Sequence, residues 1–335
     1  MDINIKEVAR KAGVSIATVS RVINGKEGYS DLTRQKVMRA IQDLNYKPNA
    51  LARGLLNQKT QTLAIIFPQV SDMFTGRVLR GVEAAAHQEN FSVIVCKTDG
   101  SHVRTMRHLE LLAEKRVDGI VFASEILVKE YSDFIQRLKI PLVVLSGESD
   151  DPGIPCVRCD DQKASFTATS YLIGQGHTQI GMLYGGRKGK LDEITRVVGY
   201  HEALSHFHVP FDPHKVITSE GFGFQEGKTG AAQLLDRFPN LTAIFAASDE
   251  MAVGVIAAAY ERGIRVPEQL SVVGYDDLPI AEMTTPPLTT IHQPLYKMGF
   301  KAASMLLDHI HGREDLFSSV VFPHTIIERG SVSRP

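Results

Sequence analysis

The sequence predicts an all-α N-terminal head followed by a doubly wound α/β body, and three observations support this fold class. Helical periodicity interrupted by a glycine turn fills about the first 45 residues. From Thr62 onward, apolar runs typical of buried strands alternate with amphipathic helical segments. Charge changes sign at the same place, because residues 1–60 hold eleven Lys and Arg against five Asp and Glu, whereas residues 61–335 hold 26 against 33. A basic head therefore precedes an acidic body.

The first helix is expected to start after Asn4 and to run to about Lys11. Asn4 and Glu7 have the three-residue spacing of a capping box. One apolar face recurs at helical spacing, at Ile5, Val8, Ala9 and Ala12. Gly13 then supplies a residue that can adopt the left-handed conformation in which many helices end.

A second helix is expected from Ile16 to about Ile23, because Ser15 is a preferred N-cap residue. It has Val19, Val22 and Ile23 to bury, and its other side carries Ile16, Ala17, Ser20 and Arg21. Two short helices joined by a tight turn are the plan of a helix-turn-helix, whose second helix enters the DNA major groove. The alternative is a helical hairpin inside an ordinary core.

A third amphipathic helix, capped by Ser30 or Asp31, completes the head and weakens that alternative. Its apolar positions are Val37, Ile41 and Leu44, and its outward positions include Arg34, Lys36 and Arg39. A basic three-helix head suits a polyanion, because neutralising phosphates supplies the sequence-independent part of DNA affinity.

Residues Tyr46 to Asn49 end the third helix, and Asn49 can cap the short segment ALARGLL. A helix of about eight residues that contains Gly54 is too short to be stable alone. Something else must therefore stabilise it. Considered by itself, Leu55 would be an apolar contact between a linker and the body.

The body alternates strand and helix patterns. Strands are expected at residues 63–67, 92–96, 119–123, 142–146, 179–184, 243–247 and 270–275. Helices are expected at residues 76–88, 104–115, 163–174, 196–207, 227–237 and 250–262. Near-continuous apolar strands separated by amphipathic helices indicate parallel sheets covered on both faces, and seven or more strands fit two doubly wound lobes.

Ligands of such sheets bind beyond the carboxyl ends of the strands, so polar residues there are candidate contacts. They are Ser71, Asp72 and Phe74, Ser124, Ser248 and Asp249, and Asp276, together with Arg196 at the start of a helix. Carboxylates and a guanidinium can chelate adjacent hydroxyl groups, and an aromatic ring offers a stacking face. The alternatives are helix capping for Ser71, Asp72 and Asp249, a turn for Asp276 and a salt bridge for Arg196.

The sequence offers no support for catalysis, a cofactor or a metal. No Ser-His-Asp arrangement occurs at recognisable spacing, and the glycines of GGRKGK lack the spacing of a phosphate loop. Cys156 and Cys159 form a lone CxxC on an extended segment, where residues three apart point to opposite faces. Three cysteines, no export signal and no long apolar run predict a cytoplasmic protein without a membrane partner.

The motifs IKEVARKAGVSIATVSRVINGK, TRQKV and LNYKPNALARGL resemble the N-terminal segment of the lactose repressor/galactose repressor (LacI/GalR) family of bacterial transcription regulators. The resemblance continues through KRVDGIVF, IGQGHTQIGML, SDEMAVGV and VPEQLSVVGYDDLPIAEMTTPPLTTIHQP, and so spans nearly the whole chain. It implies a helix-turn-helix domain at 1–47, a hinge helix and linker at 48–60, and an effector-binding and dimerisation domain at 61–335. The last would be a periplasmic-binding-protein-like clamp, with an N-lobe of about 61–160 and 292–322 and a C-lobe of about 161–291 and 323–331.

The resemblance also implies roles in DNA binding, for a dimer on a pseudo-palindromic operator in double-stranded DNA. Ile16, Ala17 and Arg21 are expected at base edges, since Arg can bind guanine bidentately and the apolar pair can contact a thymine methyl group. Contacts with DNA phosphates are expected from Ser15, Thr18, Ser20 and Asn24. Asn49 would start the hinge helix, which in the family docks in the DNA minor groove. Leu55 is at the position of the family's intercalating side chain.

For the cleft, the resemblance makes Arg196 and Asp276 the most characteristic effector contacts and a sugar or sugar phosphate the expected effector. Ser146 and Ser248 stand where many relatives have Asp and Asn, respectively. The resemblance therefore does not identify a particular ligand for this protein. No leucine-heptad tail follows Pro335, which makes a dimer the expected state. Two alternatives stay open: a catabolite-control-type regulator with a phosphorylated protein corepressor, and a sugar-binding protein or enzyme on the same clamp.

Overall fold

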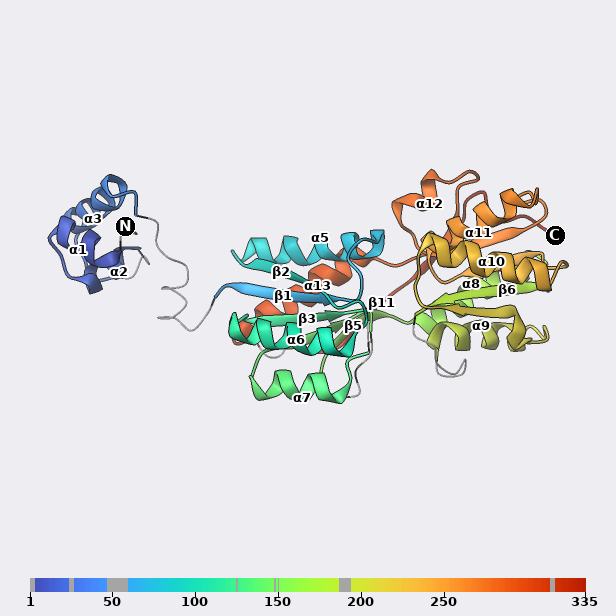
Figure 1. Ribbon diagram of the computed structural model, residues 1–335, viewed down its shortest axis with the longest axis horizontal. Helices are drawn as coiled ribbons and strands as arrows, with labels where there is room; N and C mark the ends of the chain where they lie inside the picture. Colours follow the sequence, from blue (N-terminus) through green and yellow to red (C-terminus); the bar gives the residue numbers. More distant parts are fainter. Residues whose placement is uncertain are drawn as a thin grey trace. The chain divides into compact units, whose positions relative to one another are not determined.

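The computed structural model describes residues 4–23, 27–46, 60–124, 126–147, 149, 151–186, 194–313 and 317–335. Two compact units follow one another along the chain, Met1–Gln61 and Thr62–Pro335 (Figure 1). Each is a separate body with its own core. The expected hinge helix and three of the expected DNA contacts, Asn24, Asn49 and Leu55, lie outside the described residues.

The first unit holds three helices, α1 (Ile5–Ala12), α2 (Ile16–Ile23) and α3 (Asp31–Asp43). The predicted capping box starts α1, because the backbone N–H of Asn4 donates to Glu7 Oε2 at 3.0 Å and Asn4 Oδ1 accepts from the N–H of Lys6 at 3.0 Å. Gly13 ends α1 with φ 67°, in the left-handed region. The local signals in the sequence therefore determine where this helix begins and ends.

Hydroxyl caps start the other two helices. Ser15 Oγ accepts from the backbone N–H of Thr18 at 3.1 Å, and Ser30 Oγ accepts from that of Thr33 at 3.2 Å. Ser30, rather than Asp31, is therefore the cap of α3. The helices share a small core of fully or nearly fully buried side chains, namely Val8, Ala9, Ala12, Val19, Val22, Val37 and Ala40.

The second unit contains two six-stranded sheets, which confirms the predicted α/β class and its two lobes. The N-lobe sheet is parallel throughout, in the order β11-β5-β4-β3-β1-β2. Its strands are β1 (Thr62–Phe67), β2 (Ser92–Lys97), β3 (Gly119–Ala123), β4 (Leu142–Leu145), β5 (Cys156–Cys159) and β11 (Val320–Phe322). Its helices are α5 (Met73–Gln88), α6 (His102–Glu114), α7 (Lys129–Arg137) and α13 (Leu295–Ile310).

The C-lobe sheet has the order β12-β10-β9-β8-β6-β7. Its strands are β6 (Ile180–Gly185), β7 (Val216–Ser219), β8 (Ala243–Ala246), β9 (Ser271–Asp276), β10 (Thr289–His292) and β12 (Thr325–Ile327), of which β12 runs antiparallel to β10. Its helices are α8 (Asp161–Gly174), α9 (Thr195–His206), α10 (Phe224–Arg237), α11 (Asp249–Glu261) and the short α12 (Pro279–Met283). The chain passes between the sheets after β5, after β10 and between β11 and β12.

Each sheet is covered on both faces by helices, as continuously apolar strands require. In the N-lobe, α5 and α13 cover one face and α6 and α7 the other (Figure 1). In the C-lobe, α8 and α9 cover one face and α10 and α11 the other. Full burial of each large apolar side chain in these layers stabilises the fold by about 1.5–3 kcal/mol. The layers hold the carboxyl ends of the strands, where ligands bind, in fixed positions.

No helix among the described residues has both the length and the apolar content needed to cross a membrane.

Candidate functional site

One face of α2 is buried against the other two helices, and the opposite face is open to solvent. Val19 and Val22 are buried, whereas Ala17 and Arg21 are exposed. Ile16 is 45% exposed, although it is a large apolar residue at the first position of the helix. Ile16, Ala17 and Arg21 are therefore accessible on the solvent-facing side of α2.

The polar residues expected at phosphates lie around the same helix. Ser15 is exposed, and its Oγ also lies 2.9 Å from Thr18 Oγ1. Thr18 and Ser20 are half-buried. Ser15 and Thr18 therefore stabilise the start of α2, and their hydroxyl groups can in addition contact a phosphate.

Basic side chains also gather on a part of the head outside α2. Arg10, Lys11, Lys36 and Arg39 line a hollow of about 370 Å³ between α1 and α3, and one of them, Lys11, pairs with Asp43 at 3.2 Å. The positive charge predicted from the sequence is thus spread over the head and is not restricted to the exposed face of α2.

The first predicted cleft residues lie at the start of α5 in the N-lobe. Asp72 Oδ1 accepts from the N–H of Thr75 at 2.6 Å, so Asp72 is the N-cap of this helix. Ser71 is exposed, and Phe74 is half-buried against the N-lobe core. The capping role that we considered for Asp72 is therefore observed.

Two serines lie side by side at the carboxyl edge of the N-lobe sheet. Ser124 follows β3 and Ser146 follows β4. Each comes directly after the last paired residues of the two strands, Ala123 and Leu145. Both have left-handed backbones, with φ 62° and 49°. Their Oγ atoms are buried, and within the described part of the chain neither has a hydrogen-bond partner. Unpaired buried hydroxyl groups cost free energy, so a pair of them at a strand end indicates a polar ligand.

Arg196, on the first turn of α9, is the central cation of the C-lobe strand ends. Its side chain is 13% exposed, and Nη1 donates to the carbonyl oxygen of Ala247 at 2.5 Å. Nη2 lies 3.3 Å from Asp161 Oδ1, and the guanidinium lies 3.9 Å from the centroid of the Tyr275 ring. Burial alone would lower the pKa of Arg196, but Asp161 and Tyr275 raise it above its ordinary value. The side chain is therefore held charged and in one orientation.

Asp276 ends β9 beside this arginine. It is 5% exposed, has φ 106°, and its Oδ1 accepts from Gln293 Nε2 at 2.7 Å. Burial raises the pKa of Asp276 well above its ordinary value, an effect that Arg196 partly opposes. A non-glycine residue in this backbone region is strained, and such strain is often found where side chains contact ligands.

The two predicted residues at the start of α11 have structural partners. Ser248 caps the helix, accepts from the N–H of Met251 at 3.0 Å, and donates to the carbonyl oxygen of Phe222 at 2.6 Å. Asp249 is fully buried and accepts from the N–H of Leu278 at 2.6 Å and from Thr290 Oγ1 at 2.5 Å. Asp249 has no exposed surface and both of its oxygens accept hydrogen bonds, which favours a structural role for this carboxylate.

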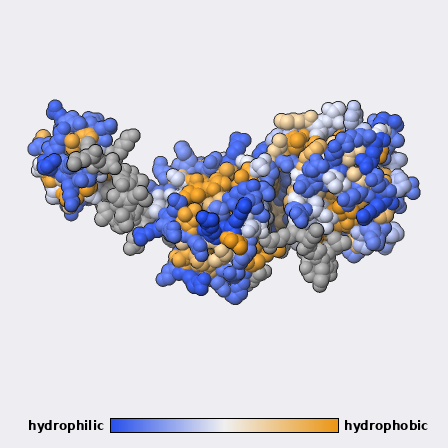
Figure 2. Space-filling view, in the orientation of Figure 1, coloured by the Kyte–Doolittle hydropathy of each residue, from blue (hydrophilic) through white to orange (hydrophobic). Residues whose placement is uncertain are grey.

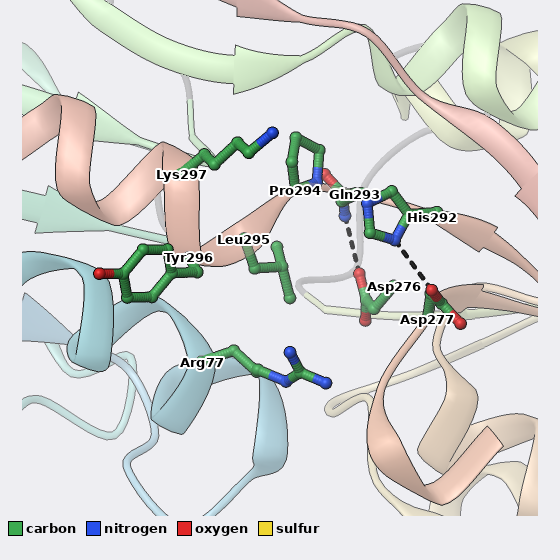
Figure 3. Close-up of a pocket in the computed structure, with 9 residues that line it drawn as sticks. All are labelled: Arg77, Asp276, Asp277, His292, Gln293, Pro294, Leu295, Tyr296 and Lys297. Atoms are coloured by element: carbon green, nitrogen blue, oxygen red, sulfur yellow. Dashed lines mark hydrogen bonds and ion pairs between the residues drawn. The ribbon is translucent and has the colours of Figure 1, made fainter. Parts of the chain in front are cut away.

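A hollow of about 190 Å³ lies where the chain crosses between the lobes, and Figure 3 shows its lining. The C-lobe supplies the end of β9 and of β10, and the N-lobe supplies α5 and the start of α13. The lining residues are Arg77, Asp276, Asp277, His292, Gln293, Pro294, Leu295, Tyr296 and Lys297. Nearby, the N–H of Met73 on α5 donates to Glu250 Oε1 on α11 at 3.0 Å, which joins the lobes directly.

Several site residues were not among the sequence predictions. Asp161 accepts from Tyr275 Oη at 2.6 Å and pairs with Arg196, and Gln293 positions Asp276. Phe222 is 38% exposed, and its ring lies 5.7 Å from the Arg196 guanidinium. Tyr275 stands in a buried strand run that looks structural in sequence, and Gln293 directly follows the short strand β10, which was not predicted. A usable signal existed for Asp161, because it begins a helix just after the short strand β5.

The strand ends of the two lobes thus carry a fixed guanidinium, a partly paired carboxyl group, a partly exposed aromatic ring and two hydroxyl groups that have no partner among the described residues. This is a set of groups for binding a polar small molecule. Within the described residues, no group of three or more His, Cys, Asp or Glu side chains could hold a metal ion. Burial raises the pKa of the Cys159 thiol to about 12, so this cysteine is an inert part of the core.

Comparison with known proteins agrees with both units. A model described as "Bacterial regulatory proteins, lacI family" matches residues 4–49, and a periplasmic binding protein-like domain matches residues 169–332. Catabolite control protein A of Priestia megaterium is 34% identical over 332 residues, which cover 99% of each chain.

Solved structures agree over the same length. A complex of the transcriptional regulator CelR with cellobiose is 30% identical, with TM-score 0.75, and covers 98% of this chain and 99% of its own. A lac repressor dimer bound to operator and an anti-inducer is 25% identical, with TM-score 0.87, and covers 99% of this chain and 100% of its own. The likeness to catabolite control protein A over the whole chain establishes the family, and the protein is a DNA-binding transcription regulator that belongs to the lacI family of bacterial regulatory proteins.

Proposed function

We propose that this regulator binds a pseudo-palindromic operator as a homodimer, acts as a repressor in the cytoplasm, and changes its operator affinity when a small effector occupies the cleft. The exposed face of α2 carries the proposal. Ile16, Ala17 and Arg21 point away from the core that the other face of the same helix builds. A helix held in this way can place its outer side chains against base edges.

Contacts in the head divide into two classes. Arg21 has the donors to bind guanine bidentately, and Ile16 and Ala17 select bases only through apolar contact. Ser15, Thr18, Ser20 and Asn24 are assigned to phosphates, where they set the register of the head on DNA. Asn49 and Leu55 are assigned to the hinge segment at 48–60 and the minor groove on the resemblance alone.

An uncovered edge supports the homodimer. Strand β2 ends the N-lobe sheet, and its Val95 is 41% exposed. Figure 2 shows apolar side chains gathered over α5 and β2 on the face in view. Exposed apolar edge strands invite pairing, and a second copy of the chain would cover this one. The similar lac repressor was solved as a dimer on its operator.

The effector is proposed to be a sugar or sugar phosphate. Arg196 and Asp276 would bind its hydroxyl groups from the C-lobe, and Ser124 and Phe74 would contact it from the N-lobe. Ser71, Asp72 and Ser248 are assigned to the border of the same space, and Asp72 and Ser248 also act as helix caps. The similar CelR structure contains cellobiose. Because both lobes contribute, binding would favour one relative position of the lobes and thereby change DNA affinity.

Selection from a randomised duplex library tests the operator proposal. The wild-type protein should enrich a pseudo-palindrome with half-sites about one helical turn apart. Arg21→Ala should lose that selectivity, while Arg10→Ala removes the same charge outside α2 and should weaken binding to all sequences alike. Equal selectivity in wild type and Arg21→Ala would show that α2 does not read bases.

Similarity to catabolite control protein A favours a second candidate, a global regulator that uses a phosphorylated protein as corepressor. Affinity for the duplex enriched from the library, measured with each kind of effector, distinguishes the two candidates. If a phosphorylated carrier protein raises operator affinity and no sugar or sugar phosphate changes it, the second candidate is correct.

A further inference from the structure

The hollow between the lobes contains a cation, Arg77, that has no neutralising partner among the residues that the structure describes. Arg77 lies on α5, one turn after Met73, and Figure 3 shows its guanidinium directed toward the end of β9 that carries Asp276 and Asp277. Across the described ranges, no ion pair or hydrogen bond involves this guanidinium, nor the ammonium group of Lys297 on α13.

The carboxyl groups that face Arg77 are already engaged with other residues. Asp277 Oδ1 accepts from Arg329 Nη2 at 2.7 Å, and Asp277 Oδ2 lies 2.8 Å from His292 Nδ1. Asp276 is bound by Gln293 and lies beside Arg196. Asp276 and Asp277 thus have partners elsewhere in the body, whereas among the described residues Arg77 and Lys297 have none.

The backbone that carries Arg77 is held firmly. Val78 next to it is fully buried. A Cβ atom on Gly81 would overlap the carbonyl oxygen of Tyr296, and one on Gly299 would overlap that of Val78, so α5 and α13 touch backbone to backbone. The side chain of Arg77 is exposed, and the close packing fixes the position of its backbone relative to α13.

A guanidinium that lines a hollow can bind a phosphate or carboxylate through two parallel hydrogen bonds, and the attraction is stronger where water is partly excluded. We propose that Arg77 is a specificity-determining residue that selects an effector with an anionic group, a sugar phosphate or a sugar acid, over the corresponding neutral sugar. The inference rests on the proposed effector cleft and narrows its ligand to an anion.

Calorimetric titration of the full-length protein at low salt tests the inference with matched ligands. The probes are ribose with ribose 5-phosphate, and glucose with glucose 6-phosphate and gluconate, with inorganic phosphate titrated alone. For at least one sugar, the anionic form should bind roughly tenfold or more tightly than the neutral form. The phosphate and gluconate arms then identify which anionic group is preferred. The preference should fall as salt is added, because ions screen a partly exposed cation.

Two variants of one helix make the test specific. Arg77→Gln should abolish the preference for the anionic form and leave the affinity for the neutral sugar unchanged. Arg80→Gln removes an exposed arginine of α5 that does not line the hollow, and it should behave as wild type.

Any of four results would overturn the inference: no anionic form binds, the neutral forms bind as well as the anionic ones, the preference survives in Arg77→Gln, or inorganic phosphate alone binds as tightly as the sugar derivatives. Operator selection from the duplex library does not depend on Arg77, so it tests the proposed function separately.

Discussion

Asp249 is a carboxylate that the C-lobe buries completely. Leu278 and Thr290 supply a donor to each of its oxygens, and Gly274 leaves room for Oδ1, because a Cβ atom there would overlap it. Burial raises the pKa of Asp249 from 3.8 to about 7. A raised pKa means that the folded state binds the proton more tightly than the unfolded state does. The resulting stabilisation is complete below about pH 4 and is lost as pH rises through about 7.

Replacing Asp249 with Asn is therefore expected to stabilise the body above pH 7. The amide keeps both hydrogen bonds, since the Thr290 hydroxyl can accept as well as donate, and it removes the buried charge. The free energy of unfolding should rise by roughly 1–3 kcal/mol at pH 8 and change little at pH 5. Denaturant unfolding of wild type and Asp249→Asn at the two pH values checks this, and an equal difference at both would contradict it.

The sequence placed Asp249 correctly at a strand end but could not reveal its burial. The residues that enclose it are 25 to 41 positions away, on β9, on β10 and in the loop between them. Arg196 and Asp276 were predicted because each stands at the start of a helix or the end of a strand. Tyr275 has no such signal, because it lies within an apolar strand run, and Gln293 was missed because the short strand that it follows, β10, was not predicted.

At the scale of elements, helix pairs in this protein meet at glycines. In the N-lobe, α5 and α13 touch at Gly81 and Gly299, and in the C-lobe α10 and α11 touch at Gly227 and Gly254. Each glycine lies against the backbone of the neighbouring helix, so a methyl group would force the pair apart. Helices that pack this closely act as one layer over their sheet.

Gly81→Ala should therefore destabilise the body by about 1–3 kcal/mol through overpacking. Gly76→Ala on the same helix is the matched control, because a Cβ atom there meets nothing within 4 Å. It should be neutral or stabilise α5 by up to about 1 kcal/mol. Thermal unfolding of both variants measures the difference. A similar midpoint for the two would show that the close approach at Gly81 does not affect the stability of the body.

Elements with local signals were predicted well, and elements without them were not. The predicted limits of α2 match the structure, because a cap and a buried face define them. Strands β7, β10, β11 and β12 are only three or four residues long and were not predicted as separate apolar runs. Helix α13 was also absent from the predictions, although its apolar spacing after Pro294 was a usable signal.

In the whole molecule, a basic head precedes an acidic two-lobed body, and the proposed palindromic operator requires two copies of each. The likeness in sequence to catabolite control protein A and in structure to the lac repressor dimer extends over the full chain, including both units. Within the body, three chain crossings and the Met73 to Glu250 hydrogen bond connect the lobes. A ligand that contacts both lobes can therefore bias their relative position.

Dimer formation through the β2 edge is open to a direct test. Val95→Lys places a charge on the edge strand and should raise the dissociation constant of the dimer by roughly tenfold or more. Val103→Lys is the control, because Val103 is 74% exposed on α6 and not on that edge. Sedimentation velocity over a range of concentrations reports the constants. If Val95→Lys dimerises as well as wild type, another surface forms the dimer.

The reciprocal effect of effector and operator on each other tests the central claim most directly. Operator affinity is measured with and without a saturating effector, and effector affinity is measured with and without the enriched operator, at one salt concentration. Because linked equilibria are reciprocal, both affinities should change by the same factor, in the range of about 5 to 150-fold. An effector that binds the cleft and leaves operator affinity unchanged would contradict the account.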